Sequence, residues 1–140
     1  IIMFFPLLNQ EEKEHCLSLL IFAANCDNHY HSKEKNLIAG YSLLMGIAPS
    51  TPTNPNGEEI IQFFSQKLDI VKRAVFLETL GLIESDSIVH PEEDKLIKKI
   101  ADSFGFSTAY IDEARVWIKE MLPLYYRGFE LLGLNIEQSQ

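Results

Sequence analysis

The chain has 140 residues, of which 46% are hydrophobic and 23% are charged, and its 20 acidic and 12 basic residues give a formal net charge of −8. This size and composition are typical of one globular domain that buries its own core. The acidic balance argues against a nucleic-acid partner, because such a protein replaces the counterions on phosphates with a stripe of Lys and Arg.

The cysteine content indicates the cellular compartment, and the N-terminal segment indicates whether the chain inserts into a membrane. Two cysteines, Cys16 and Cys26, do not make a disulfide framework, and the composition is that of an intracellular protein. Residues 1–8, IIMFFPLL, lack a basic region and a cleavage site and are too short to span a bilayer. The sequence therefore predicts no membrane insertion. Residues 1–8 either pack on the domain or contact a partner.

Helical signals dominate the first half of the chain. Asn9, followed three residues later by Glu12, has the form of a capping box, and the apolar residues beyond it run almost all round a helix, as in a central, buried one. A second helix from Ser32 has apolar residues at helical spacing and ends at Gly46. Residues 48–57 are rich in Pro and are predicted to form a linker.

The second half of the chain predicts further helices. A short one follows the linker in EEIIQFFSQKL, and Asp69 is the expected N-cap of IVKRAVFLETLGLIE. Another ends at Gly105, the next opens at Ser107 or Thr108, and a last helix starts at Pro123. No run alternates with the period of two that marks a half-buried strand. The expected fold class is all-α, with about six to seven helices.

One phrase occurs twice, 59 positions apart (27 to 86): DNHYHSKEKNLI at 27–38 and DSIVHPEEDKLI at 86–97. Laying 17–47 on 76–106 gives these identical pairs: Asp27 and Asp86, His31 and His90, Glu34 and Glu93, Leu37 and Leu96, Ile38 and Ile97, Gly46 and Gly105. They fall at the loop start, helix start, first turn, core face and helix stop of a helical hairpin. Such hairpins bury their apolar faces only by packing together.

The repeat sets the expected domain organisation. A single domain covers 1–140, and its parts are hairpin repeat 1 at about 9–47, the Pro-rich linker at 48–57, hairpin repeat 2 at about 69–106, and C-terminal helices at 107–133.

The second phrase predicts a helix start in detail. His90 is the expected N-cap, Pro91 the first helical residue, and Glu93 reaches back to the backbone N–H of the cap. The first phrase allows two frames, with either His31 or Ser32 as the N-cap.

The doubled phrase resembles the loops of the TerB-like family, the all-helical domain associated with tellurite resistance, whose loops read ADG, then Ser, Asp or His, then Glu. The resemblance covers 17–47 and 76–106. It implies a TerB-like helical bundle with two related hairpins in a cytoplasmic bacterial protein linked to stress or phage defence. It also implies acidic loop residues that hold a divalent cation. The chain departs from the family pattern at Asn28 and Ser87, where Gly is usual.

The acids of the two phrases are the candidate metal ligands: Asp27, Glu34, Asp86 and Glu93. Their hard oxygen atoms suit Ca²⁺ or Mg²⁺, but the spacing is not that of an EF-hand. The interpretation that we favour needs no metal, because each Asp can satisfy its turn and each Glu can cap its helix.

Cys26, His29 and His31, with His15 and Cys16 nearby, are the residue types of a Zn²⁺ site, but no paired CxxC or HxxxH motif brings four ligands together. The cysteines are poor candidates for nucleophiles, because they lie on a helix expected to be buried. The sequence also lacks a Gly-rich phosphate loop, a G-x-S-x-G elbow and an HExxH motif. We therefore expect a protein that is not an enzyme.

The functional expectation is a non-enzymatic TerB-like stress-response module with a protein-interaction or sensor role, in which binding of a divalent cation through the acidic loops is optional. The alternative is a purely structural scaffold domain that docks a protein partner without metal. The C-terminal segment contains four aromatic residues that are candidates for a partner surface: Trp117, Tyr125, Tyr126 and Phe129. Their helical spacing is typical of a core, although Tyr and Trp are also favoured at interfaces.

Overall fold

The computed structural model describes residues 4–26, 40–43, 46, 56–85 and 90–133. Its elements are the 3-10 helix η1 (Phe5–Leu7) and the α-helices α1 (Gln10–Asn25), α3 (Gly57–Ser65), α4 (Asp69–Glu84), α5 (Pro91–Phe104) and α6 (Thr108–Leu131). Residues 40–43 are helical as well. The described residues contain no strand. The all-α prediction is therefore confirmed.

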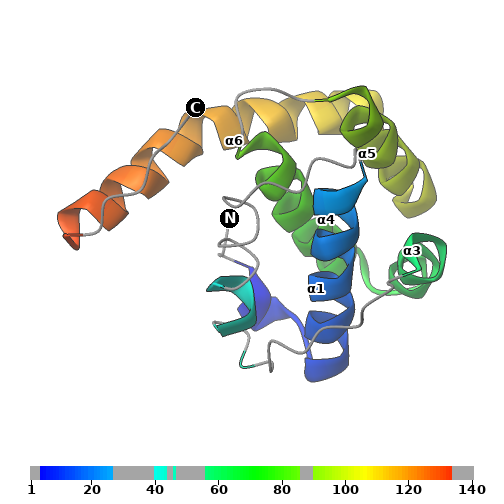
Figure 1. The fold of residues 1–140 in the computed structure, drawn as a ribbon. Coiled ribbons are helices and arrows are strands. Elements are labelled where there is room, and N and C mark those ends of the chain that lie inside the picture. The colour runs from blue at the N-terminus through cyan, green and yellow to red at the C-terminus, as the bar shows by residue number, and fades with distance from the viewer. Residues whose placement is uncertain (1–3, 27–39, 44–45, 47–55, 86–89, 134–140) are drawn as a thin grey trace.

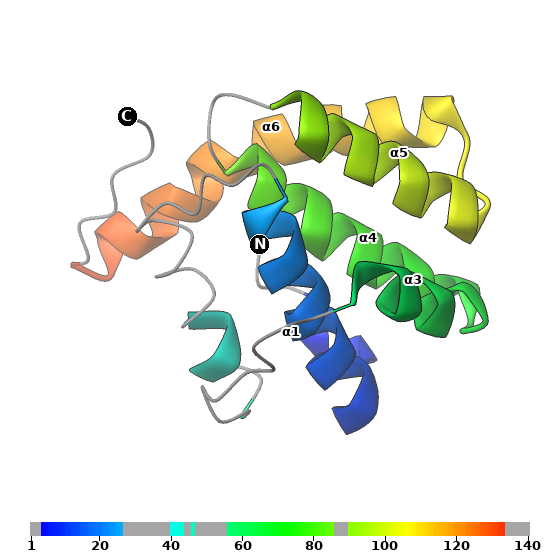
Figure 2. The ribbon, with the colours of Figure 1, turned by 45° about the vertical axis from the view of Figure 1, so that its right-hand side comes forward.

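Two helices form the middle of the fold. α1 and α4 pack side by side, α3 lies against α1 and α5, and both α5 and α6 pack on α4 (Figures 1 and 2). α4 is enclosed on most of its surface, since residues 74–76 and 78–83 are all buried. The sequence predicted α1 as the central helix, and α4 shares that place. Among the described residues, none of the helices is both long enough and apolar enough to cross a lipid bilayer.

The starts of α1 and α4 differ in their capping. Asn9 Oδ1 accepts the N–H of Glu12 at 2.8 Å, and Glu12 Oε1 accepts the N–H of Asn9 at 2.9 Å, which confirms the predicted capping box. The N-cap of α4 is Leu68, which supplies no side-chain hydrogen bond. The prediction of Asp69 as N-cap is wrong, because Asp69 is the first helical residue and pairs with Arg73 one turn later.

The 59-residue offset of the sequence repeat also relates the two central helices. α1 spans Gln10–Asn25 and α4 spans Asp69–Glu84, and each has 16 residues. The residues that end them have nearly the same backbone angles, φ −66° and ψ −21° at Cys26 and φ −64° and ψ −21° at Ser85. The likeness of the two phrases therefore extends to the full length of the helices that precede them.

The glycines at the ends of the two repeats also correspond. Gly46 has a φ of 69° and Gly105 a φ of 80°, in the left-handed region that favours glycine after a helix. Their N–H groups donate to the carbonyls of Leu43 and Asp102, which are again 59 positions apart. The predicted helix stops are therefore present at both glycines.

α6 differs from its prediction. It runs unbroken over Thr108–Leu131 with Pro123 inside it, so the prediction that a separate last helix starts at Pro123 is wrong. A proline inside a helix removes one backbone hydrogen bond. Contacts on both sides of Pro123 offset this loss, because Leu122 packs against the core and Tyr126 is buried. The C-terminal part of α6 projects away from the other helices (Figure 1).

The N-terminal segment packs on the domain where the structure describes it. Phe5 and Leu8 are buried, and the Phe5 ring meets the Tyr41 ring edge-on with centroids 5.5 Å apart. Residues 1–3 lie outside the described residues.

The predicted linker ends at α3. Residues 48–55 lie outside the described residues, and Asn56 caps α3 by accepting the backbone N–H groups of Glu58 and Glu59. A Cβ atom at Gly57 would lie 2.6 Å from the ring of Phe22, so glycine permits the close approach of α3 to α1.

Candidate functional site

One of the four predicted metal ligands lies among the described residues. Asp27, Glu34 and Asp86 fall outside them. Glu93 is 4% exposed in the first turn of α5, and its Oε1 accepts the N–H of the N-cap His90 at 3.0 Å. The carboxylate of Glu93 is therefore used as a helix cap, and the metal site stays a prediction.

The zinc alternative also lacks described ligands. Among the residues that the structure describes, no three His, Cys, Asp or Glu side chains form a group that could hold a metal ion. His29 and His31 lie outside that part of the chain. The ring of His15 stacks on that of Phe63 with centroids 3.8 Å apart, and its Nδ1 lies 2.8 Å from the carbonyl oxygen of Glu11. His15 thus packs against α3.

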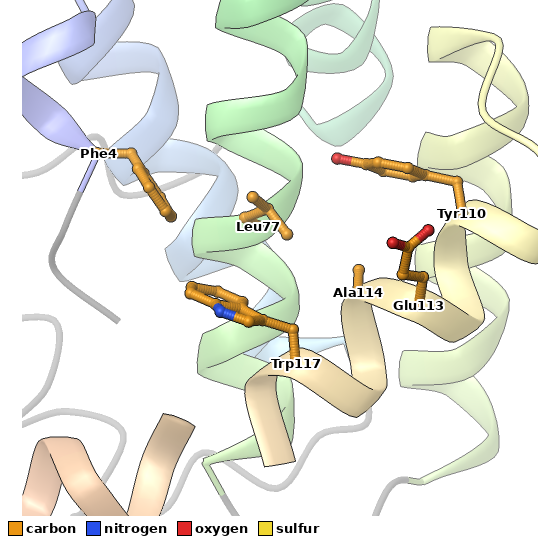
Figure 3. A pocket seen from close by; sticks show the side chains of 6 residues that line it. All are labelled: Phe4, Leu77, Tyr110, Glu113, Ala114 and Trp117. Atoms are coloured by element: carbon orange, nitrogen blue, oxygen red, sulfur yellow. The ribbon is translucent and has the colours of Figure 1, made fainter. Parts of the chain in front are cut away.

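An open pocket of about 340 Å³ lies between the N-terminal segment, α4 and α6. Figure 3 shows its lining side chains, which are Phe4, Leu77, Tyr110, Glu113, Ala114 and Trp117. The side chains of Phe4, Leu77 and Trp117 point toward one another and form an apolar end, with the Phe4 and Trp117 ring centroids 6.1 Å apart. The hydroxyl of Tyr110 and the carboxylate of Glu113 lie at the other end (Figure 3). The pocket is therefore apolar with a polar rim.

The N-terminal end of α6 positions the pocket residues that this helix contributes. The N-cap Ser107 accepts the backbone N–H of Tyr110 through Oγ at 3.1 Å, which confirms the predicted opening of this helix. Tyr110, Ala114 and Trp117 then follow at i, i+4 and i+7, a spacing that puts them on one face. The cap thus fixes the rotation at which this face meets α4.

Aromatic and cationic contacts hold the side chain of Tyr110, which forms one wall of the pocket. The Tyr110 and Phe106 ring centroids are 4.7 Å apart, and Phe76 packs against Tyr110 at 5.8 Å. The guanidinium of Arg73 lies 4.7 Å from the Tyr110 ring centroid, in cation–π contact.

A long-range hydrogen bond holds Phe4, which lines the opposite side of the pocket. The backbone N–H of Phe4 donates to Oε1 of Glu78 at 3.0 Å. Glu78 is the neighbour of Leu77 on α4 and is completely buried. One turn of α4 therefore supplies a pocket side chain and also anchors the segment that supplies Phe4.

Glu78 belongs to a buried group of titratable side chains. Cys16 and Tyr41 are also completely buried. Burial raises the pKa of both groups, and the charge of Glu78 raises each pKa further. The Cys16 thiol therefore stays protonated near neutral pH and is unsuited to act as a nucleophile. Glu78 was not among the candidate residues predicted from the sequence, although it is the lone acid in the apolar run AVFLETLGLI and corresponds to Leu19 in the first repeat.

The C-terminal aromatic residues have different surroundings. Trp117 lines the pocket, whereas Tyr126 is 5% exposed and burial raises the pKa of its hydroxyl. Tyr125 meets Phe129 edge-on with centroids 4.9 Å apart. Trp117 is therefore the member of this set that a partner can reach through the pocket.

A second hollow of about 410 Å³ is lined by Gln62, Phe63, Gln66 and Lys67. Its lining comes from the end of α3 and the two residues that follow, and Lys67 Nζ already lies 4.5 Å from the centroid of the Phe63 ring. The pocket beside Trp117 is the stronger candidate site, because three separate elements converge on it.

Comparison of the chain with protein-family models, with curated proteins and with solved structures finds no match in any of the three. The TerB-like resemblance of the two phrases is therefore neither supported nor contradicted by a known relative.

Proposed function

We propose that this chain is a non-enzymatic, TerB-like protein-interaction module that acts in a cytoplasmic stress response. The observation that carries the interaction role is the apolar pocket beside Trp117. The two TerB-like phrases support the family and the stress response. The proposal needs no bound metal, since Glu93 serves as a helix cap.

The pocket chemistry favours a protein ligand over a reacting small molecule. Its walls are Phe, Leu, Ala, Tyr and Trp side chains, and Glu113 is its one ionisable carboxylate. Trp and Tyr are enriched among the residues that dominate protein interfaces. The Trp117 side chain is partly exposed, so it offers an apolar surface to a partner while its other side packs on the core.

Site-specific photo-crosslinking in cells tests this proposal. A benzophenone amino acid replaces Val116, which is 56% exposed and adjacent to Trp117. In a second protein it replaces Asp102, which is exposed on α5. We expect a protein adduct at position 116 that is absent at position 102 and is lost when Trp117→Ala is added. Equal adducts at both positions, or none at 116, contradict the proposal.

A further inference from the structure

One exposed stripe of α6 continues from the pocket. Glu113, Trp117, Glu120 and Leu124 follow one another at i, i+4, i+7 and i+11 and so share one helix face. We call these four residues the α6 ridge. Glu113 and Glu120 are exposed, and Leu124 is 71% exposed. Large apolar side chains therefore alternate with acids along a surface that begins inside the pocket (Figure 3).

The acids of the α6 ridge have no basic partner among the described residues. Ion pairs engage the carboxylates of Glu84, Asp94 and Glu92 on neighbouring helices, but none engages Glu113 or Glu120. Their side chains are separated by seven residues, or roughly 10 Å along the helix at 1.5 Å per residue. Two unpaired negative charges thus flank Trp117 at a spacing of two helical turns.

We propose that the pocket and the α6 ridge bind a basic amphipathic helix of a partner protein. This inference rests on the proposed interaction role and names the chemistry of the partner. The bound helix places one bulky apolar side chain in the pocket, against Phe4, Leu77 and Trp117. It places Lys or Arg about one turn to either side of that anchor, within reach of Glu113 and Glu120.

Physical chemistry favours this occupant over two others. A helix in a groove presents anchors at i, i+3, i+4 and i+7, which matches the two-turn spacing of the acids. The net charge of −8 attracts a basic partner at long range. A second copy of this chain would bring Glu113 and Glu120 against the same acids, and an anionic membrane surface would repel them.

The test uses the full chain and a displayed library of 16-residue peptides with randomised positions. We expect the wild type to enrich peptides that carry a bulky apolar residue with Lys or Arg three to four positions to each side. The double variant Glu113→Lys with Glu120→Lys should bind these peptides at least tenfold more weakly. It should instead gain affinity for versions in which Glu replaces the basic residues.

A matched control separates local pairing from net charge. Glu14→Lys with Asp102→Lys makes the same change in net charge at exposed positions on α1 and α5, and should leave peptide affinity within about twofold of the wild type. If the control weakens binding as much as the ridge variant does, long-range charge alone explains the preference and the inference falls.

Two further outcomes distinguish this inference from the proposed function. Enriched apolar peptides without a basic preference, bound equally by the wild type and the ridge variant and lost on Trp117→Ala, overturn the inference and leave the interaction role standing. A library that yields no peptide whose binding depends on Trp117 overturns both.

Discussion

The backbone N–H of Phe4 donates a 3.0 Å hydrogen bond to Oε1 of Glu78, and 74 positions of sequence separate the two residues. The acceptor is completely buried on α4, and the donor carries the ring that faces Trp117 across the pocket. A backbone N–H removed from water needs an acceptor. Glu78 therefore has a structural task that Leu, the residue at the equivalent position 19, could not perform.

Glu78→Leu should release the N-terminal wall of the pocket. One hydrogen bond of this kind contributes about 1 kcal/mol, so hydrogen exchange of the Phe4 amide should become roughly five- to tenfold faster. The emission of Trp117, the single tryptophan, should change as the Phe4 ring leaves its place opposite the indole. Exchange followed by mass spectrometry or NMR, with fluorescence, checks both expectations.

Glu78→Gln is the matched control, because its side-chain carbonyl can still accept the Phe4 N–H. Its exchange rate should stay near that of the wild type. If Glu78→Leu and Glu78→Gln exchange this amide at the same rate, the hydrogen bond does not hold the wall.

The repeat predicts a stabilising substitution at Leu68. This residue is the N-cap of α4 at the position where α1 has Asn9, yet it is 75% exposed and makes no side-chain cap. Leu68→Asn should give the first turn of α4 the acceptor it lacks. The free energy of unfolding should rise by about 1 kcal/mol, and the melting temperature by about 4 °C. Urea unfolding and a thermal melt measure the two.

The reciprocal variant Asn9→Leu provides the comparison for this effect. It removes the acceptor of the Glu12 N–H and should lower the free energy of unfolding by about 1 kcal/mol. A decrease in stability on Leu68→Asn would show that the two helix starts are not equivalent.

Sequence alone predicted the helix ends that depend on neighbouring residues. The Asn9 capping box, the Glu93 cap and the glycine stops at Gly46 and Gly105 each involve residues within about four positions. Local hydrogen-bond geometry decides such features, so a short stretch of sequence contains the needed information. Pro123 was misread because the continuity of α6 depends on tertiary packing of the residues around it.

The candidate site was much less predictable. Trp117 could be singled out by residue type, but its neighbours Phe4 and Leu77 come from elements far away in the sequence. Nothing in the local pattern indicates that these three side chains meet. The buried Glu78 was detectable as a lone acid in an apolar run, but its partner Phe4 was not, because that contact depends on how the N-terminal segment returns to α4.

A third prediction separates the cap role of Glu93 from metal binding. With EDTA present, Glu93→Ala should lower the free energy of unfolding by about 1 kcal/mol, because the N–H of His90 loses its acceptor. Glu93→Gln retains an oxygen acceptor, so its free energy of unfolding should fall by less. Thermal melts should give the same losses in millimolar Ca²⁺, Mg²⁺ or Zn²⁺.

A cation-induced rise in the melting temperature of the wild type would contradict a purely structural role. Asp86→Ala with Glu93→Ala identifies its source, because loss of the rise in this variant would assign the cation to the acidic loop.

The last prediction concerns Arg115, which joins three helices. Its Nη2 lies 2.7 Å from Oδ1 of Asp94 on α5, and its Nε lies 3.3 Å from Oε1 of Glu84 on α4. Hydrogen bonds from Arg115 and Lys98 lower the pKa of Asp94 below its usual 3.8. Burial raises the pKa of Glu84 above its usual 4.5, against the opposing charge of Arg115. Removal of Arg115 should therefore have a pH-dependent cost.

Arg115→Met should lower the free energy of unfolding by about 2 kcal/mol at pH 7, because a largely buried Glu84 carboxylate loses its cation. The difference in free energy of unfolding between the wild type and this variant should become smaller as the pH falls. In the variant the pKa of Glu84 rises further, and its protonation relieves the cost as the pH approaches 4.5. In the wild type the contribution of Asp94, present above pH 3.8, is lost as the pH falls through its lowered pKa. Urea unfolding between about pH 7 and pH 3.5 measures this difference in free energy of unfolding. For the control Arg127→Met, at an exposed position, we expect a difference from the wild type that does not depend on pH. A difference for Arg115→Met that is likewise independent of pH would contradict this coupling.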